Sequence, residues 1–236
     1  MGLRPRDTGD RTSHADGAGR PDRRWTRHVT GGGLYRAGGK RLLDIVGALA
    51  LFVLVLPVLA LTAVTILVTL GWPLFFQDRR AGWGGVPFTL WKFRTMTSDR
   101  GPDGRLLADA DRLTPLGRFL RRSSVDELPE LVHVLRGTMS LVGPRPLPVA
   151  YVARYSADQA RRLDVRPGLT GLAQVRGRNA LDWDDRLAID TWYVDHYNVQ
   201  LDLEVLLRTV VVVWRGHGVT QPGHATMSEF AGSGRT

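Results

Sequence analysis

Residues 45–70 (IVGALALFVLVLPVLALTAVTILVTL) limit what the rest of this chain can fold into, because none of these 26 residues is charged. An α-helix rises about 1.5 Å per residue, so a helix over this run is long enough to cross a bilayer core of about 30 Å. The run begins too far into the chain, and is too long, for the apolar core of a cleaved secretory signal. The sequence therefore predicts a helix that stays in the protein and enters a membrane.

Three arrangements of this helix are open: a buried core helix, a straight span, or a re-entrant helix that turns back. A buried core helix seldom needs so long an uncharged run. Two basic residues stand on each side of the run. They are Lys40, Arg41, Arg79 and Arg80. Because the positive-inside rule asks for an excess of Lys and Arg on the cytoplasmic flank only, two basic flanks indicate that both ends face the cytoplasm.

Pro57, near the middle of the run, gives the helix a cause to bend, since it lacks a backbone donor and clashes with the preceding turn. Bent backbone in lipid needs other hydrogen-bond partners, and we predict that the hydroxyl groups of Thr62 and Thr65 supply them. The sequence thus predicts a re-entrant membrane helix over residues 39–72, bent at Pro57, with a straight span as the alternative.

The basic charge of the chain is concentrated at its start. The chain carries a formal charge of +9, and residues 1–41 hold ten Lys or Arg against four Asp. Such a balance suits nucleic acid, anionic lipid or phosphorylated small substrates, and the adjoining apolar run favours lipid. Residues 1–38 are rich in Gly and lack apolar periodicity, which predicts a disordered basic head. The chain has no cysteine, which excludes disulfides and thiolate-bound metal.

Beyond the apolar run the pattern predicts an α+β domain, mostly helical, over residues 73–230, with a short tail over residues 231–236. PLFFQDRR and VPFTLWKFRTM flank a Gly-containing segment and predict a small β-hairpin. Residues 112–122 predict an amphipathic helix with several Arg, typical of a helix in a membrane interface or packed on a core. Further helices are predicted over residues 126–136, 151–163, 182–197 and 201–216.

Three tryptophans near the apolar run, Trp72, Trp83 and Trp91, suit the level of the lipid headgroups, where an indole keeps one wet edge. For Trp91, packing in the core of the domain is an equal alternative.

The most unusual local pattern is the pair Asp126 and Glu127 at a predicted helix start. Several arginines stand close to it in the sequence, namely Arg118, Arg121, Arg122 and Arg145. Two adjacent carboxylates among guanidinium groups can cap a helix, bind a divalent metal, form salt bridges or attack a phosphorus atom. Arg145 lies in the rigid segment GPRP, and the planar guanidinium fork matches phosphate oxygens, which favours a phosphate site. The histidines show no metal-ligand spacing, His133 is expected on a helix surface, and no P-loop motif is present.

Five segments together resemble the bacterial sugar transferases, the monotopic polyprenyl-phosphate sugar-1-phosphate transferases. They are KRLLDIVGALALFVLVLPV, WKFRTM, SSVDELPELVHVLRGTMSLVGPRP, RPGLTGLAQVRGRN and GHATM, in this order. The resemblance covers about residues 36–230. It implies a re-entrant helix and a site on the cytoplasmic face of the cell membrane. It also implies transfer of sugar-1-phosphate from a UDP-sugar to undecaprenyl phosphate, at the start of a surface glycan or exopolysaccharide pathway.

The resemblance also implies roles for single residues. Asp126 matches the nucleophile that forms an aspartyl-phosphosugar intermediate and Glu127 its partner, with Mg²⁺ bound near Asp126. Positive positions around the phosphates match Lys92, Arg94, Arg121 and Arg145, and a loop facing sugar or nucleotide carries Gln174 and Arg178. His224 in GHATM is expected to line the site or to serve structure.

Three positions depart from the family pattern. Thr138 stands where an acidic residue is common, Leu56 where a serine often precedes the proline, and Glu130 where Gln is common. The departures leave the pair Asp126 and Glu127 intact. The extra charge of Glu130 is expected to affect metal or phosphate binding slightly.

Two other functions compete with the transferase. A non-catalytic membrane scaffold would use the basic head and the amphipathic helices without any role for Asp126. A nucleic-acid-binding protein rests on charge alone, and the basic residues lie in a Gly-rich head or beside apolar segments, so no nucleic-acid partner is expected. The sequence leaves open the oligomeric state and the sugar, an acetamido hexose or a plain hexose, with GHATM favouring the former by resemblance.

Overall fold

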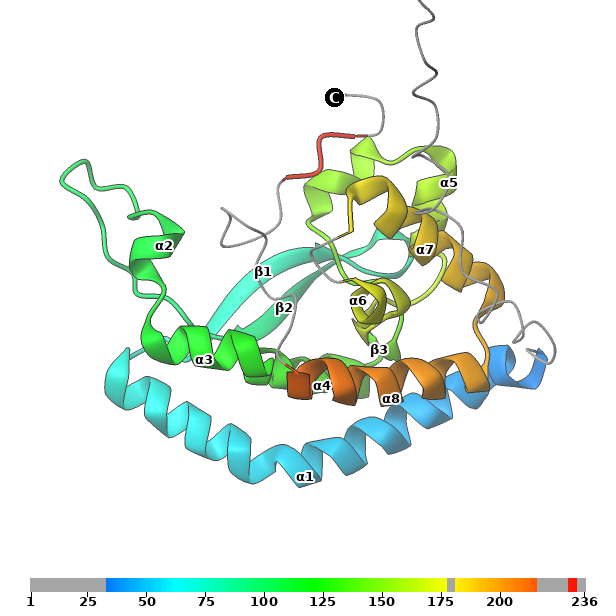
Figure 1. The fold of residues 1–236 in the computed structure, drawn as a ribbon, viewed down its shortest axis with the longest axis horizontal. Coiled ribbons are helices and arrows are strands. Elements are labelled where there is room, and N and C mark those ends of the chain that lie inside the picture. Colours follow the sequence, from blue (N-terminus) through cyan, green and yellow to red (C-terminus); the bar gives the residue numbers. More distant parts are fainter. Residues whose placement is uncertain (1–32, 178–180, 216–228, 233–236) are drawn as a thin grey trace, which may run out of the picture.

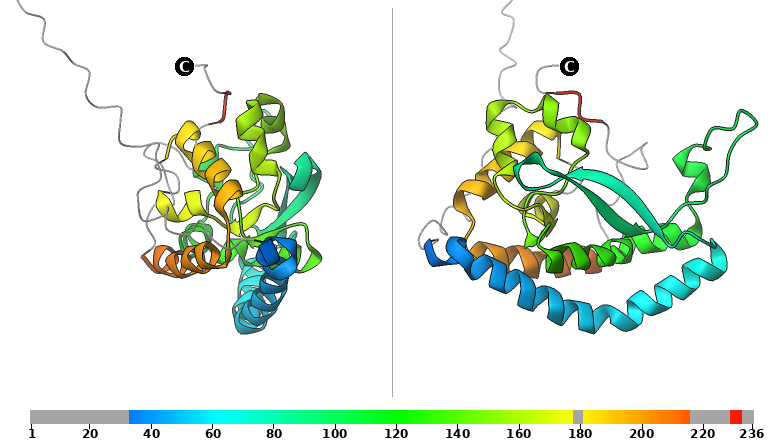
Figure 2. Two further views of the ribbon diagram at one scale, coloured as in Figure 1. Left: turned by 90° about the vertical axis from the view of Figure 1, so that its right-hand side faces the viewer. Right: turned by 180° about the vertical axis from the view of Figure 1, so that it is seen from behind.

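The computed structural model of the chain describes residues 33–177, 181–215 and 229–232 (Figure 1). A long helix, α1 (Lys40–Thr69), runs along one side of the molecule. The layer next to it holds the helices α3 (Pro115–Ser123), α4 (Leu131–Arg136) and α8 (Val199–Arg215). Farther from α1 lie the β-hairpin and the helices α5 (Ala157–Ala160), α6 (Leu172–Arg176) and α7 (Trp183–His196) (Figures 1 and 2).

Helix α1 packs on the rest of the protein along one face and is exposed on the other. Asp44 and Ala48 are buried in its first half, and Thr62 and Ile66 are buried in its second half. Between these pairs the helix is bowed, so that both of its ends turn toward the same side (Figures 1 and 2), and partly buried side chains such as Phe52 pack against the main core. Its outward face is a continuous apolar surface, with Leu54 75% exposed. By length and composition, this is the one helix of the described residues that could enter a membrane.

The predicted membrane helix is confirmed as a helix, with three differences in detail. Pro57 lies inside an unbroken α1, so the helix bends without separating into two half-helices. Thr65 Oγ1 donates to the Leu61 carbonyl and not to the Val53 carbonyl that Pro57 leaves without a donor, and Thr62 makes no side-chain hydrogen bond among the described residues, so the predicted role of the two hydroxyl groups at the bend is wrong. The helical structure also begins before residue 39, since the π-helical turn η2 (Tyr35–Gly39) precedes α1. Residues 1–32 of the predicted head lie outside the described part of the chain.

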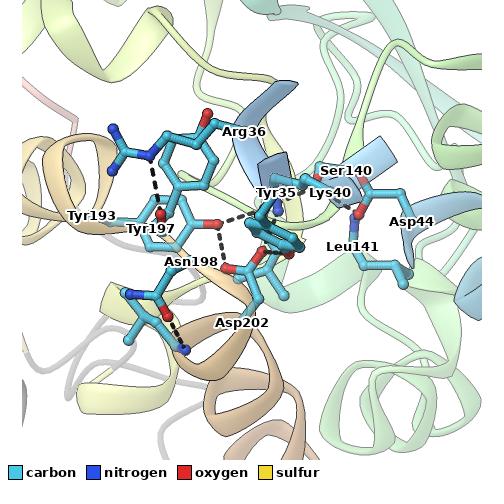
Figure 3. A network of polar contacts seen from close by, with 12 residues as sticks. Tyr35, Arg36, Lys40, Asp44, Ser140, Leu141, Tyr193, Tyr197, Asn198 and Asp202 are labelled. Atoms are coloured by element: carbon cyan, nitrogen blue, oxygen red, sulfur yellow. Dashed lines mark hydrogen bonds and ion pairs between the residues drawn. The ribbon is translucent and has the colours of Figure 1, made fainter. Parts of the chain in front are cut away.

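Buried carboxylates hold the first end of α1 in place (Figure 3). Asp202 of α8 accepts hydrogen bonds from Tyr35 Oη at 2.5 Å, Lys40 Nζ at 2.5 Å and Tyr193 Oη at 2.6 Å. Asp44 of α1 accepts from Ser140 Oγ and the Leu141 N–H, each at 2.9 Å. These bonds join α1 to α7, to α8 and to the strand β3 (Ser140–Val142).

Arginine side chains tie both ends of α1 to neighbouring carbonyl groups. At the first end, Arg41 donates to the Val134 carbonyl at 2.7 Å and the Leu135 carbonyl at 2.9 Å, in the last turn of α4. At the far end, Arg94 donates to three carbonyls just past α1, those of Leu70, Gly71 and Trp72. Carbonyls at helix ends have no intrahelical partner and carry partial negative charge, so guanidinium groups suit both places.

The strands form two small ladders. The predicted hairpin is confirmed as β1 (Phe75–Ala81) and β2 (Pro87–Phe93), antiparallel from the pair Phe75 and Phe93 to the pair Ala81 and Pro87. β3 pairs in parallel with β4 (Gly168–Thr170), matching Ser140 with Gly168 and Val142 with Thr170. The main core lies between these elements, and its fully buried members include Leu131, Val134, Met139, Tyr193 and Leu201.

The predicted helices around the site were partly right. α3, α7 and α8 are confirmed, and Thr114 and Asp182 cap the starts of α3 and α7. The single helix predicted over residues 151–163 is wrong. It is three short helices, η5 (Val149–Arg154), α5 and η6 (Arg161–Leu163), because Ser156 and Gln159 form a capping box that starts a new helix.

The placement of Trp83 at the headgroup level is wrong. Trp83 lies in the hairpin turn η3 (Trp83–Gly85), at the end of the hairpin far from α1 (Figure 1). Its indole N–H donates to the Asp164 carbonyl at 3.1 Å, and the Arg166 guanidinium stacks over its ring. Trp72 follows α1 and is 79% exposed, as expected for a residue at that level.

Replacing Asp202 by alanine is expected to weaken the fold strongly. The substitution leaves Lys40 and two tyrosine hydroxyls without their buried acceptor, which typically costs about 3–5 kcal/mol. Unfolding of the purified protein in detergent measures the effect. The matched control is Asp195→Ala, since Asp195 pairs with Arg161 on the surface, where solvent screening leaves an ion pair with little effect on stability. Equal stability of the two variants would contradict the anchoring role of Asp202.

Candidate active site

The candidate site is built on a short 3₁₀ helix, η4 (Val125–Glu130), which follows α3 directly. Ser124 joins the two with φ 58°, the left-handed conformation, and so turns the chain sharply at the end of α3. A 3₁₀ helix has three residues per turn, so Glu127 and Glu130 lie above one another on one face. Asp126 lies on a neighbouring face. The predicted α-helix at this place starts as 3₁₀ and becomes α4 only after Pro129, which cannot donate a backbone hydrogen bond.

Two cations from separate elements hold Glu127. Lys92 Nζ, from β2, lies 2.6 Å from Glu127 Oε1. Arg145, from the segment between β3 and η5, approaches the same oxygen with Nη2 at 2.5 Å and the other oxygen with Nη1 at 3.4 Å. Burial alone would raise the pKa of Glu127, but Arg145 and Lys92 outweigh it and lower that pKa well below its usual range. Glu127 is therefore ionised throughout the physiological range.

Asp126 is in a different electrostatic state. Its carboxylate is buried, with 8% of the residue exposed, and forms no hydrogen bond or ion pair with any described residue. Burial and the neighbouring charge of Glu127 raise its pKa to about 6, against the opposing influence of Lys92, Arg121 and Arg145. Two adjacent carboxyl groups thus have pKa values shifted in opposite directions, an arrangement found where such groups have distinct chemical roles.

Arg145 is held from behind by a buried ion pair. Arg162 donates to Asp190 Oδ2 with Nε at 3.1 Å and Nη2 at 2.8 Å, and the same Nη2 donates to the Arg145 carbonyl at 2.7 Å. Arg162 and Asp190 are nearly inaccessible, at 2% and 3% exposure. The pair fixes the backbone of Arg145 while the Arg145 side chain points to Glu127.

Glycines let the two loops of the motifs LVGPRP and RPGLTG meet backbone to backbone. The Gly143 N–H donates to the Thr170 carbonyl and the Gly168 N–H to the Pro144 carbonyl, each at 2.9 Å. A Cβ on Gly168 would lie 2.1 Å from Gly143 N, which leaves no room for any side chain. The close approach places the loop of Arg145 against β4.

The structure brings together four of the predicted site residues and separates others. Lys92, Asp126, Glu127 and Arg145 form one cluster, and Arg121, held by Thr95 Oγ1 at 3.0 Å, acts on the charge of Asp126. Arg94 instead binds carbonyls past the end of α1, so its predicted phosphate contact has no support from its position. Gln174 donates to the Leu169 carbonyl and forms no contact with the cluster among the described residues. Arg178 and His224 lie outside the described residues.

Sequence reasoning missed several residues of the site. Glu130 was treated as a minor departure, yet it is 2% exposed and lies 3.2 Å from Lys92 Nζ. The pairing of Arg162 with Asp190 joins residues 28 positions apart, and no sequence pattern marks it. His133 was expected on a helix surface, which is wrong. It is 4% exposed and packs between Phe88 and Trp91, because this face of α4 turns toward β2.

The carboxylates of this site offer one protein ligand for Mg²⁺ and not a complete set. No group of three or more His, Asp or Glu in the described part of the chain is arranged to hold a metal. Asp126 alone of the pair has a carboxylate that no cation holds closely. Mg²⁺ commonly keeps several waters and binds through one or two carboxylates together with substrate phosphates, so a single ligand fits such a shared site.

Comparisons with known proteins place the sequence among the sugar transferases. The model of a family described as "Bacterial sugar transferase" matches residues 35–216. The chain is 46% identical over 195 residues to "Uncharacterized sugar transferase EpsL" of Bacillus subtilis (strain 168), covering 83% of this chain and 96% of that protein.

Two further relatives carry names that state a reaction. A "UDP-glucose:undecaprenyl-phosphate glucose-1-phosphate transferase" of Caulobacter vibrioides is 45% identical, with 72% of this chain and 68% of that protein covered. An "Undecaprenyl-phosphate galactose phosphotransferase" of Salmonella typhimurium is 36% identical, with 76% of this chain but 41% of that longer protein covered.

The raised pKa of Asp126 predicts that Asp126→Asn stabilises the folded protein. The ionised carboxylate weakens the fold as pH rises from about 4 to about 6, so the cost is complete above pH 6 and absent below pH 4. We expect the asparagine variant to be more stable at pH 7.5 by roughly 1–3 kcal/mol, with a smaller gain at pH 4.5. Urea unfolding in detergent without metal measures both values. Asp158→Asn, at an exposed site, is the control, and a less stable Asp126→Asn at pH 7.5 would contradict the assignment.

Proposed function

The chain belongs to the bacterial sugar transferase family, and on this basis we propose that it is a phosphoglycosyl transferase acting on a UDP-sugar and undecaprenyl phosphate. The observation that carries the proposal is the site around Asp126. A carboxylate without a close cation stands beside a second carboxylate that Lys92 and Arg145 hold ionised. The products are a polyprenyl diphosphosugar and UMP, which suits the first step of a surface glycan or exopolysaccharide pathway. One relative is named "Exopolysaccharide production protein ExoY".

In the proposed first half-reaction, the Asp126 carboxylate attacks the phosphorus that carries the sugar. An O–P bond to Asp126 forms, and the bond from this phosphorus to the bridging oxygen breaks, so that UMP leaves with the electron pair. The reaction needs an ionised Asp126, and a pKa of about 6 leaves this group ionised at neutral pH and more nucleophilic than an ordinary carboxylate.

In the second half-reaction, a phosphate oxygen of undecaprenyl phosphate attacks the same phosphorus and releases the Asp126 carboxylate. Glu127 is a poor base for this step, because Lys92 and Arg145 hold its pKa low. We infer that it orients the two cations toward the phosphates. Arg145 and Lys92 then stabilise the charge that develops on the phosphoryl oxygens.

Asp126 would hold Mg²⁺ together with the oxygens of the substrate. When bound, it neutralises charge on the diphosphate and on the leaving UMP. Asp126 would be the protein's own ligand to this ion, since its carboxylate is the one of the pair without a close cation.

The proposed place of action is the cytoplasmic face of the cell membrane. Both ends of α1 pack on one domain, since Ile66 joins Phe93 and Leu120 in one cluster while Ala48 joins the main core. A straight span would carry one end to the opposite side, away from that domain. Large apolar side chains on the neighbouring helices are also exposed and extend the lipid-facing surface. They include Phe119 on α3 and Leu207, Val210 and Trp214 on α8.

A non-catalytic scaffold is less well supported. A scaffold would need the exposed apolar helices but gives no reason for three buried or half-buried carboxyl groups around Lys92 with strongly shifted pKa values. Such shifts concentrate at functional sites.

A panel of sugar nucleotides tests the proposed reaction. UDP-glucose, UDP-galactose and UDP-N-acetyl hexosamines are incubated with the detergent-purified protein, undecaprenyl phosphate and Mg²⁺, and UMP release is measured. We expect one class to be turned over, Asp126→Asn to lose at least a thousandfold in rate, and chelation of Mg²⁺ to stop the reaction. Asp158→Asn should keep full activity. Full UMP release by Asp126→Asn would disprove the assignment of Asp126 as the nucleophile. Absence of UMP release from every sugar nucleotide of the panel would disprove the proposed transferase activity.

The topology of α1 is tested by labelling in intact cells. The chain has no cysteine, so single cysteines introduced at Gly39 and at Trp72 report each end of the helix without background. We expect both to be protected from an impermeant thiol reagent until the membrane is opened. Labelling of one end only in intact cells would establish a straight span.

A further inference from the structure

A third carboxyl group, that of Glu130, lies beside the proposed catalytic pair. It belongs to the last position of η4, one 3₁₀ turn after Glu127, so both glutamates face β2. Glu130 is 2% exposed, which is rare for a glutamate unless it is paired. Neither the reaction proposed above nor its named residues require it.

Lys92 lies between the two glutamates and is closer to Glu127 than to Glu130. Its Nζ lies 2.6 Å from Glu127 Oε1 and 3.2 Å from Glu130 Oε1. The nearer contact is a well-aligned hydrogen bond, whereas the buried Glu130 Oε1 has only this longer and less well-aligned contact with Lys92. Glu130 therefore shares the charge of Lys92 with Glu127 and is held less closely by it.

Charged and titratable groups surround Glu130 on several elements, so the protonation state of Glu130 alters the charge of the whole cluster. Lys92 comes from β2, Glu127 from its own helix, and Arg145 from the loop before η5. From α3 the nearest cation, Arg121, acts on Asp126, and from α4 the buried His133 packs against rings. α1 has no charged residue after Asp44. Burial, and then Glu127, raise the pKa of Glu130 to about 7 against the attraction of Lys92.

We propose that Glu130 is a positioning residue for the proposed transfer. Through its contact with Lys92, Glu130 sets how much of the Lys92 charge is available to the diphosphate of the sugar nucleotide. With Glu130 neutral, three carboxyl groups share two charges against three cations, and the cluster favours an anionic substrate. When Glu130 is ionised, two glutamate charges offset the charge of Lys92, and the additional negative charge repels the diphosphate. The inference rests on the proposed function and concerns substrate binding more than the chemical step.

The test compares wild type with Glu130→Gln, which keeps the shape of the side chain and removes its charge. The measured quantity is UMP release in the first half-reaction, with Mg²⁺ and without undecaprenyl phosphate, because the lipid phosphate itself titrates near neutral pH. The substrate is UDP-glucose, or the panel member with the highest rate. Half-saturating concentration and maximal rate are determined from pH 6.5 to 8.5, a range in which the diphosphate of a UDP-sugar does not change charge.

For wild type we expect the half-saturating concentration to rise roughly three- to tenfold from pH 6.5 to 8.5, the effect of one partly screened charge at close range. In Glu130→Gln the rise should be absent, with a maximal rate within about twofold of wild type. Glu229→Gln, at a surface position, should keep the wild-type profile. Glu130→Met is a second uncharged variant should Glu130→Gln fold poorly.

Two results would overturn the inference. One is a wild-type half-saturating concentration that does not change with pH. The other is an identical rise in wild type and in a folded uncharged variant. Either result leaves UMP release intact, and so differs from failure of the proposed function, in which wild type releases no UMP from any sugar nucleotide.

Discussion

The structure depends on the way both ends of α1 are bound to a single domain. At the first end, Asp202 and Asp44 accept hydrogen bonds that lie in the protein interior. At the far end, Arg94 holds the carbonyls that follow the helix. Apolar packing of its inner face adds to this attachment, with Ala48 in the main core and Ile66 beside Leu120, whereas its outward face gains nothing from the domain. Directional, buried polar bonds add a fixed register to this packing, and the outward apolar surface of α1 remains exposed.

This attachment also determines where the candidate chemistry takes place. α3 packs on the far half of α1 through Leu116 and Leu120, and α3 leads directly into η4. Asp126 therefore lies one helix away from the apolar surface, connected to it by a short and sharply turned segment. A lipid-borne phosphate and a water-soluble nucleotide can meet only at such a boundary.

Within the site, the two adjacent carboxyl groups differ because their neighbours differ. Lys92 and Arg145 converge on Glu127 from a strand and from a loop, and the loop is fixed in turn by Arg162 and Asp190. Asp126 receives only the more distant influence of the same cations, and burial dominates its pKa. Pre-arranged cations near a carboxylate of raised pKa are what transfer of a phosphoryl group requires, since little reorganisation is then needed during the reaction.

The sequence by itself determined the elements and the chemical character of the protein. The uncharged run predicted α1, two β-rich runs around a Gly-containing segment predicted the hairpin, and the pair Asp126 and Glu127 indicated the candidate site, since each signal is local. Tertiary structure decided what local patterns do not encode. In the folded protein Arg94 binds carbonyls past the end of α1, and His133 is buried. Packing also brings Glu130 close to Lys92 and pairs Asp190 with Arg162. The physical reason is that a side chain's charge state and partners depend on groups far away in the chain, and only packing brings those groups within a few ångströms.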